Sequence, residues 1–232
     1  MPRSTSNGQC FFCKDSFSKQ TIARHLNSCG QRVLTEKKSS GKKAQGKIFH
    51  LLVEGRYAPQ YWMHLEVPAS ATLDDLDGFL RDIWLECCGH LSEFIIQGER
   101  YTSSSPFADA DEIDGLSMGT ELGEILQPKM KFSHDYDFGT TTHLTLKVVS
   151  EKEDQSASND VQLLARNEPP TYPCYSCRKP ATQICSQCAY EGTGLVCDAC
   201  ASEHECGEDM FLPVVNSPRV GMCGYTGDEA AW

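Results

Sequence analysis

The stretch YWMHLEVPASATLDDLDGFLRDIWL (residues 61–85) joins a strand to a helix and decides the fold class of the chain. Its first seven residues alternate in character, with the apolar side chains at Tyr61, Met63, Leu65 and Val67. A period of two is typical of a β-strand that turns one face toward a core. A proline follows and ends this predicted strand.

The second part of the stretch has the pattern of an amphipathic helix. Thr72 is a favourable N-cap, and Asp75 stands three residues later, as in a capping box. The apolar side chains that follow recur at helical spacing, at Leu73, Leu76, Leu80 and Ile83. We therefore expect a helix that begins near residue 73 and ends at about residue 85.

Further elements surround this strand and helix on both sides. Apolar or alternating runs predict strands in KIFHLLVE (47–54), LSEFIIQ (91–97), KFSHDYDF (131–138) and HLTLKVV (143–149). A short helix is expected at residues 122–126. A hairpin, a helix, a strand and a second hairpin make an α+β domain, and their order predicts a β-grasp-like fold for it.

The chain has 13 cysteines, and 11 of them lie in the two end segments. The N-terminus is polar, without the apolar core of a secretory signal, and no apolar run reaches the roughly 18 residues of a membrane helix. We therefore expect a cytoplasmic protein with no membrane association. Disulfides are rare in that compartment, so zinc is the ordinary reason for so many cysteines.

Composition predicts five consecutive parts. They are a C2HC-type zinc finger (1–34), a basic linker (35–45), the α+β domain (46–150), a polar linker (151–160) and a cysteine-rich binuclear zinc module (161–232).

The N-terminal cluster reads Cys10-x2-Cys13-x11-His25-x3-Cys29. Two cysteines on a turn would meet a histidine and a cysteine from one helical face, because residues four apart on a helix are neighbours. This spacing is typical of a zinc finger that holds one ion.

The C-terminal cluster offers nine candidate ligands for two zinc ions. They are Cys174, Cys177, Cys185, Cys188, Cys197, Cys200, His204, Cys206 and Cys223. The short gaps favour a cross-brace, in which the first C-x-x-C pair shares an ion with the third and the second shares an ion with His204 and Cys206. Consecutive pairing, with Cys223 as a ligand, is the alternative. The sequence thus predicts three zinc ions, each with four protein ligands, which indicates structural zinc.

Two enzyme readings compete with structural zinc. His64-x-Glu66 and Cys174-x-x-Cys177 reproduce the letters of the zinc-deaminase signature. We reject this reading because the two halves fall in different parts of the chain, and His64 and Glu66 are expected on the solvent face of a strand. The other is a hydrolase-type enzyme acting on nucleic acid or a small molecule through a pocket near His90 and Asp137. His134, Asp135 and His143 are further candidates for its acid–base groups.

Charge is distributed unevenly along the chain, whose formal net charge is −11. Residues 1–47 hold ten lysines and arginines against two acidic residues, so that segment is +8 and the remainder is −19. A basic segment beside a zinc finger favours DNA or RNA as a partner of residues 1–47. A solvated linker is the alternative reading. The acidic C-terminal module favours a protein partner.

The middle domain resembles the Ri-plasmid ORF-three-like family, a bacterial and archaeal family often found on mobile elements. The likeness rests on LEVPASATLDDLDGFLRDIWL (65–85), CGHLSEF (88–94) and HDYDFG (134–139). The ending LPVVNSPRVGMCGYTG (212–227) is similar to a tail of relatives with the same zinc module. The resemblance implies a bacterial protein linked to mobile elements and assigns no chemistry. The sequence therefore favours a zinc-binding, non-enzymatic interaction protein, with the hydrolase as its alternative.

Overall fold

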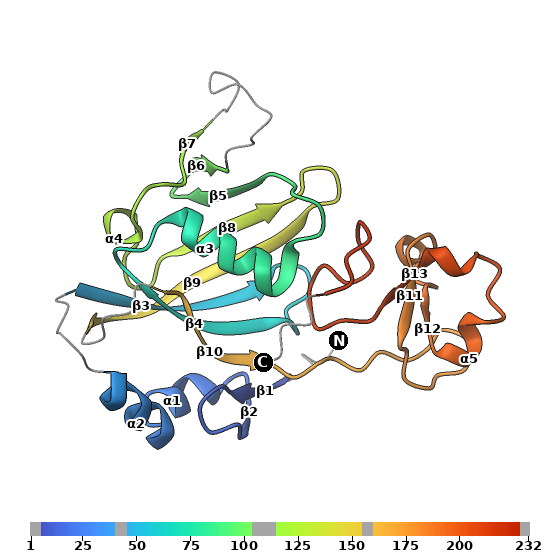
Figure 1. The fold of residues 1–232 in the computed structure, drawn as a ribbon, viewed down its shortest axis with the longest axis horizontal. Coiled ribbons are helices and arrows are strands. Elements are labelled where there is room, and N and C mark those ends of the chain that lie inside the picture. The colour runs from blue at the N-terminus through green and yellow to red at the C-terminus, as the bar shows by residue number, and fades with distance from the viewer. Residues whose placement is uncertain (1–5, 40–45, 104–114, 155–159, 228–232) are drawn as a thin grey trace. The chain divides into compact units, whose positions relative to one another are not determined.

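The computed structural model of the protein describes residues 6–39, 46–103, 115–154 and 160–227 (Figure 1). Chain contacts divide it into two compact units. The first unit runs to Leu80 and resumes over Leu91–Glu168, and the second combines Arg81–His90 with Pro169–Ala231. Within the described ranges, no helix has the length and apolar character needed to cross a membrane.

The first unit is built on a ten-stranded sheet in the spatial order β2-β1-β10-β4-β3-β9-β8-β5-β6-β7. Neighbouring strands are antiparallel except β6 and β7, which are parallel. The strands are β1 (Asn7–Cys10), β2 (Ser16–Ser18), β3 (Gly46–Gly55), β4 (Trp62–Pro68), β5 (Ser92–Ile96), β6 (Glu99–Thr102), β7 (Leu116–Ser117), β8 (Lys131–Tyr136), β9 (Thr142–Asp154) and β10 (Gln162–Asn167). The helices up to residue 125 are α1 (Ile22–Leu26), α2 (Gly30–Ser39), α3 (Leu73–Leu80), the π-helical turn η1 (Arg81–Leu85) and α4 (Leu122–Ile125).

The fold is mixed α+β and mostly sheet, which confirms the predicted class, while its β-grasp arrangement stays a prediction. α3 begins with the predicted capping box. The Asp75 amide donates to Thr72 Oγ1 at 3.2 Å, and the Thr72 amide donates to the Asp75 carboxylate at 2.8 Å. α3 is tied to β8 by a buried pair, because the carboxylate of Asp77 lies 2.6 Å from Nε2 of His134.

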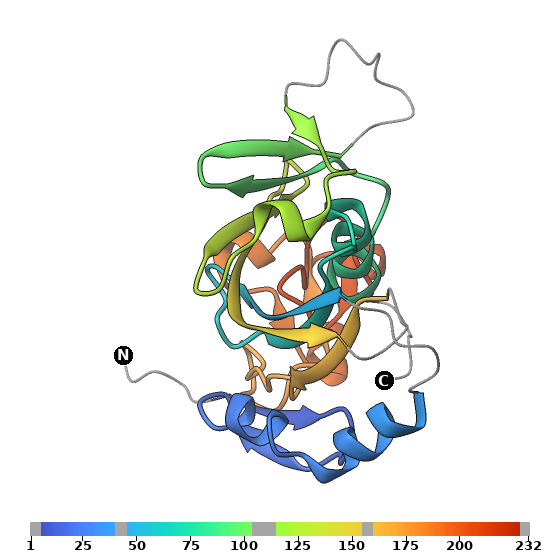
Figure 2. The same ribbon diagram turned by 90° about the vertical axis from the view of Figure 1, so that its left-hand side faces the viewer.

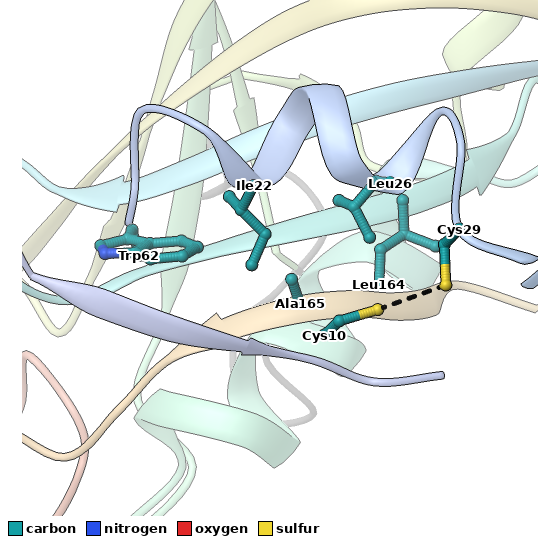
Figure 3. Close-up of a cluster of buried hydrophobic side chains, with 7 residues drawn as sticks. All are labelled: Cys10, Ile22, Leu26, Cys29, Trp62, Leu164 and Ala165. Carbon is teal, nitrogen blue, oxygen red and sulfur yellow. Dashed lines mark hydrogen bonds between the residues drawn. The ribbon is translucent and has the colours of Figure 1, made fainter. Parts of the chain in front are cut away.

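The N-terminal segment belongs to the sheet, since β1 pairs with β10 and β10 pairs with β4. Figures 1 and 2 show the N-terminal helices on the side of the sheet that carries β10. α1 contributes Ile22 and Leu26 to a buried cluster with Trp62 of β4 and with Leu164 and Ala165 of β10 (Figure 3). The finger residues therefore share their hydrophobic core with the sheet.

This packing buries β4 on both faces, so the expectation that His64 and Glu66 face solvent is wrong. The predicted strand is present, but it is not half-buried, because the N-terminal segment covers its second face. Glu66 is ion-paired with Arg32 of α2 and, at 2.7 Å, with Lys152 of β9. Nδ1 of His64 lies 2.8 Å from Nε2 of His50 on β3.

The two histidines of this face are held neutral. Burial, together with the charges of Arg32 and Lys152, lowers the pKa of His50 to about 4. Burial also lowers the pKa of His64 to about 3, helped by the charges of His50 and Lys19. Both side chains are therefore unprotonated near neutral pH.

Both predicted linkers contain some regular secondary structure. α2 continues to Ser39, and β9 continues to Asp154. Residues 40–45 and 155–159, the greater part of these predicted linkers, lie outside the described residues. The five-part division of the chain stays a prediction.

The second unit is small and poor in regular structure. Its three-stranded sheet has the order β12 (Leu195–Val196), β11 (Gln183–Cys185), β13 (Phe211–Pro213). Among the described residues, one short helix, α5 (Asp198–Ala201), two 3-10 turns, η3 (Ala189–Glu191) and η4 (Glu208–Met210), and the π-helical turn η1 complete it. Its buried cluster joins Val196 to Cys174 and Cys197, so cysteines stand where a larger domain would use aliphatic side chains.

We expect Arg32→Met to lower the free energy of unfolding by about 3 kcal/mol, because removing one member of a buried ion pair leaves its partner poorly compensated. Urea unfolding of the full chain measures this change. Arg24→Met is the matched control: Arg24 lies exposed on α1, so this variant should change stability by less than about 0.5 kcal/mol. Equal effects of the two substitutions would contradict the stabilising role of the Arg32–Glu66 pair.

The buried histidine pair predicts acid sensitivity. Both histidines have a lower pKa in the folded chain than in the unfolded chain, so the unfolded state binds more protons and stability falls as pH drops below about 6.5. At pH 5 the loss should be about 2 kcal/mol for each histidine. The double variant His50→Leu/His64→Leu should lose less stability between pH 7.5 and pH 5 in urea unfolding. The same pH dependence in both proteins would refute the assignment.

Candidate metal centres

Four groups of cysteine and histidine side chains come close enough, within the described residues, to hold metal ions. In each group the four ligand atoms all lie within 4.8 Å of one another. A tetrahedral zinc ion with Zn–S bonds of about 2.3 Å separates its sulfurs by about 3.8 Å, so the groups are compatible with zinc. The groups are Cys10/Cys13/His25/Cys29, Cys174/Cys177/Cys197/Cys200, Cys185/Cys188/His204/Cys206 and Cys87/Cys88/His90/Cys223.

The N-terminal group is assembled by a turn and a short helix. Cys10 ends β1, and the turn after it closes when the Lys14 amide donates to the Cys10 carbonyl at 2.9 Å. Lys14, which follows Cys13 in this turn, takes a positive φ of 63°. Nε2 of His25 on α1 lies 3.3 Å from Cys13 Sγ, and Cys29 Sγ lies 3.9 Å from Cys10 Sγ (Figure 3).

The second group is built entirely of cysteines. Cys177 Sγ lies 3.5 Å from Cys197 Sγ, just before α5, and Cys200 lies within that helix. The backbone amide of Cys177 lowers the pKa of Cys174 to about 6, and the amide of Cys200 lowers the pKa of Cys197. The turn amides therefore favour the thiolate, which is the form that binds metal.

The third group joins β11 to the segment after α5. Cys188 Sγ lies 3.5 Å from Nε2 of His204 and 3.7 Å from Cys206 Sγ. Burial opposes ionisation of Cys185, but hydrogen bonds from the Cys188 amide and the His204 side chain outweigh it and lower its pKa to about 7.

The two C-terminal groups interleave along the chain. The first C-x-x-C pair meets the third, and the second meets His204 and Cys206, which is the geometry of a cross-brace. Cys223, the ninth candidate of this segment, lies in neither group. Which residues bind an ion, and which ion they bind, stays a prediction.

Sequence reasoning missed the fourth group. It combines Cys223 with Cys87, Cys88 and His90, which precede it by more than 130 residues, and all four belong to the second unit. Two signals could have found it. The run Cys-Cys-x-His places three possible ligands within four residues, and the C-terminal segment holds one ligand more than two ions need.

The acid–base candidates of the first unit have structural partners. His134 pairs with Asp77, and Nδ1 of His143 lies 2.8 Å from the carboxylate of Asp135. Asp137 has a positive φ of 65° and caps the turn after β8, because its carboxylate accepts a hydrogen bond from the Gly139 amide at 2.9 Å.

The residues of the two enzyme hypotheses have structural contacts, and they are divided between the two units. His64 and Glu66 are buried in the sheet of the first unit, whereas Cys174 and Cys177 belong to the all-cysteine group of the second. The zinc-deaminase letters therefore have local explanations on both sides. His90 of the hydrolase reading belongs to the fourth group.

These features define a mixed α+β protein that carries Cys/His clusters suited to metal. Residues 48–172 match the family of the plasmid pRiA4b ORF-3-like protein, and the chain belongs to this family. A crystal structure of a protein of unknown function from Methanosarcina mazei Go1 is similar at 20% identity and a TM-score of 0.44, over 54% of this chain and 72% of that chain. No curated protein matches the chain.

The cross-brace can be tested by counting zinc ions in two double variants with native mass spectrometry. Cys174→Ser/Cys197→Ser removes two ligands of one group, so it should lose one zinc ion relative to the parent. Cys174→Ser/Cys188→Ser removes one ligand from each of two groups and should lose two. The reverse result would establish consecutive pairing and contradict the cross-brace.

Proposed function

We propose that this chain is a zinc-stabilised, non-enzymatic interaction protein that contacts DNA or RNA through its basic N-terminal segment. The observation that carries this proposal is the exposed surface of the finger residues. Lys14 and Arg24 are exposed there, and Phe11 is 41% exposed with Lys14 Nζ 4.3 Å from its ring centroid. Cations beside an exposed aromatic ring suit phosphates and unstacked bases.

The N-terminal cations have two different roles in this proposal: some form ion pairs within the fold, and others contact phosphates. Lys19 is ion-paired with Glu54, Arg32 with Glu66 and Lys47 with Glu151, so these three cations stabilise the fold. Lys37 and Lys38 lie on α2, and Lys42 and Lys43 of the basic segment fall outside the described residues. These four lysines, together with Lys14 and Arg24, are the phosphate contacts of the proposal.

The ligands of the Cys/His groups support a non-enzymatic role for the protein. Each of the three groups expected from the sequence offers four protein ligands, which leaves no position for a substrate or a reactive water. Zinc in such sites organises a small module that has little core of its own. We therefore assign the three ions a structural role.

The C-terminal unit is the proposed docking site for a protein. It exposes Tyr175, Tyr190 and Met210, with exposed fractions of 54%, 72% and 40%. The acidic residues of this segment disfavour nucleic acid there. Exposed aromatic side chains and methionine are enriched at protein interfaces.

The cysteines and the family support what we propose for the protein's location in the cell and for its host. We place the protein in the cytoplasm, because the described cysteines are all free thiols and suit a reducing compartment. The family takes its description from a plasmid reading frame, which supports a bacterial host and a link to mobile elements. A β-grasp-like scaffold for the central part belongs to the same proposal.

The nucleic-acid contact can be tested with the zinc-loaded full chain on duplex DNA. If these six cations together neutralise about five phosphates, log K against log salt should have a slope near −4 to −5. The variant Lys37→Ser/Lys38→Ser/Lys42→Ser/Lys43→Ser should make that slope shallower by about 3 to 4. Fluorescence anisotropy at several salt concentrations measures both slopes.

A matched control removes four exposed lysines elsewhere, in Lys129→Ser/Lys131→Ser/Lys147→Ser/Lys179→Ser. It changes the net charge equally and should leave the slope unchanged. Equal losses in both variants would mean that only net charge matters. No binding by the parent at low salt would remove nucleic acid from the proposal and leave the protein-docking role.

A further inference from the structure

The loop after η1 is held in a fixed shape by Arg81. Its guanidinium lies 2.8 Å from the Glu86 carboxylate and donates to the His90 carbonyl at 2.7 Å. The Gly89 amide donates to the other oxygen of Glu86, and Gly89 takes a positive φ of 75°. One arginine thus fixes both ends of the loop that carries Cys87, Cys88 and His90.

The C-terminal tail is fastened to the same segment. Ser217 Oγ donates to the Trp84 carbonyl at 2.7 Å, and the Arg219 amide donates to that Ser217 oxygen at 2.9 Å. The Met222 amide then donates to the Arg219 carbonyl at 3.1 Å. Cys223 follows in a left-handed conformation with a φ of 47°. These contacts place the sulfur of Cys223 beside the loop.

The four ligand atoms form a compact set. Cys88 Sγ lies 3.7 Å from Cys87 Sγ and 3.8 Å from Cys223 Sγ. Nε2 of His90 lies 3.0 Å from Cys88 Sγ and 3.2 Å from Cys223 Sγ. Tetrahedral zinc separates two sulfurs by about 3.8 Å and a sulfur from a nitrogen by about 3.6 Å, so small adjustments admit the ion.

We propose that Cys87, Cys88, His90 and Cys223 bind a fourth zinc ion, which exchanges faster than the other three and fastens the C-terminal tail. Adjacent cysteines would ordinarily point apart, but here their sulfurs lie 3.7 Å from each other. On loading, each of the three thiols releases its proton to solvent as its sulfur binds the ion.

A buried arginine supports an anionic site. Arg219 is fully buried, and its guanidinium donates to Cys87 Sγ at 3.3 Å. A buried guanidinium requires anionic or strongly accepting partners. Three thiolates with one zinc ion carry a net charge of −1, so the loaded site supplies an anion beside this cation.

Exposure distinguishes the fourth site from the others. Each of the other three groups contains at least one buried cysteine, namely Cys10, Cys174 or Cys185. In the fourth group Cys88 and Cys223 are exposed, and Cys87 and His90 are half-buried. Water and competing chelators therefore reach this ion directly, which is the basis for its faster exchange.

Native mass spectrometry of the full chain, purified with reductant and zinc, tests the site. The parent should carry four zinc ions, and Cys223→Ser and His90→Gln should each carry three. Because retained ions report intact folding of the other groups, a simple failure to fold is recognised. His143→Gln is the matched control, since His143 lies in none of the four groups, and it should keep four ions.

Two results would overturn the site. One is a parent with three ions that Cys223→Ser leaves at three. The other is a parent with three ions whose mass is lower by two hydrogens, which would identify a disulfide among Cys87, Cys88 and Cys223. Either result leaves the three expected zinc ions, and so the proposed function, intact.

Exchange kinetics test the second half of the proposal. Release of zinc from the parent to a chromogenic chelator should show one fast ion followed by slower ions, and Cys223→Ser should lack the fast phase. Hydrogen exchange of the amides at residues 217–225 should be faster in Cys223→Ser and unchanged in His143→Gln. A fast phase that persists in Cys223→Ser would refute the assignment.

Discussion

The pairing of β10 with β4 on one side and β1 on the other is the interaction on which the first unit depends. β1 carries the first zinc-ligand candidate, Cys10, so the finger is positioned by backbone hydrogen bonds to the sheet. α1 then packs on Trp62, and Arg32 of α2 pairs with the carboxylate of Glu66. Without this pairing, one face of β4 would present an indole, a histidine and a carboxylate to water.

In the second unit, cysteine side chains take the place that aliphatic side chains have in a larger core. Its buried cluster is centred on Cys174, Cys197 and Val196, which is too small to offset the conformational entropy of the loops. Hydrogen bonds from turn amides lower the pKa of Cys174, Cys185 and Cys197, which favours the thiolate form that binds metal. Metal binding and folding are then expected to be one event.

Features that depend on residues close together in the chain could be predicted from the sequence. Features that depend on contacts between distant residues could not. The capping box at Thr72 and Asp75, the alternation of β4 and the interleaving of the C-x-x-C pairs depend on residues near one another in the chain. The burial of His64 and Glu66 depends on the N-terminal segment and on β10, which no short pattern reveals. The Cys87–Cys223 group joins residues more than 130 positions apart, so composition could only indicate a surplus ligand.

The place of β10 in the chain has a consequence for synthesis on the ribosome. β1 is made first, yet its partner over Gln162–Asn167 emerges some 150 residues later. Until then, Ile22, Leu26 and the indole of Trp62 have no Leu164 or Ala165 to cover them. A nascent chain is thus expected to expose this apolar surface during most of its translation, when such surface is prone to aggregate.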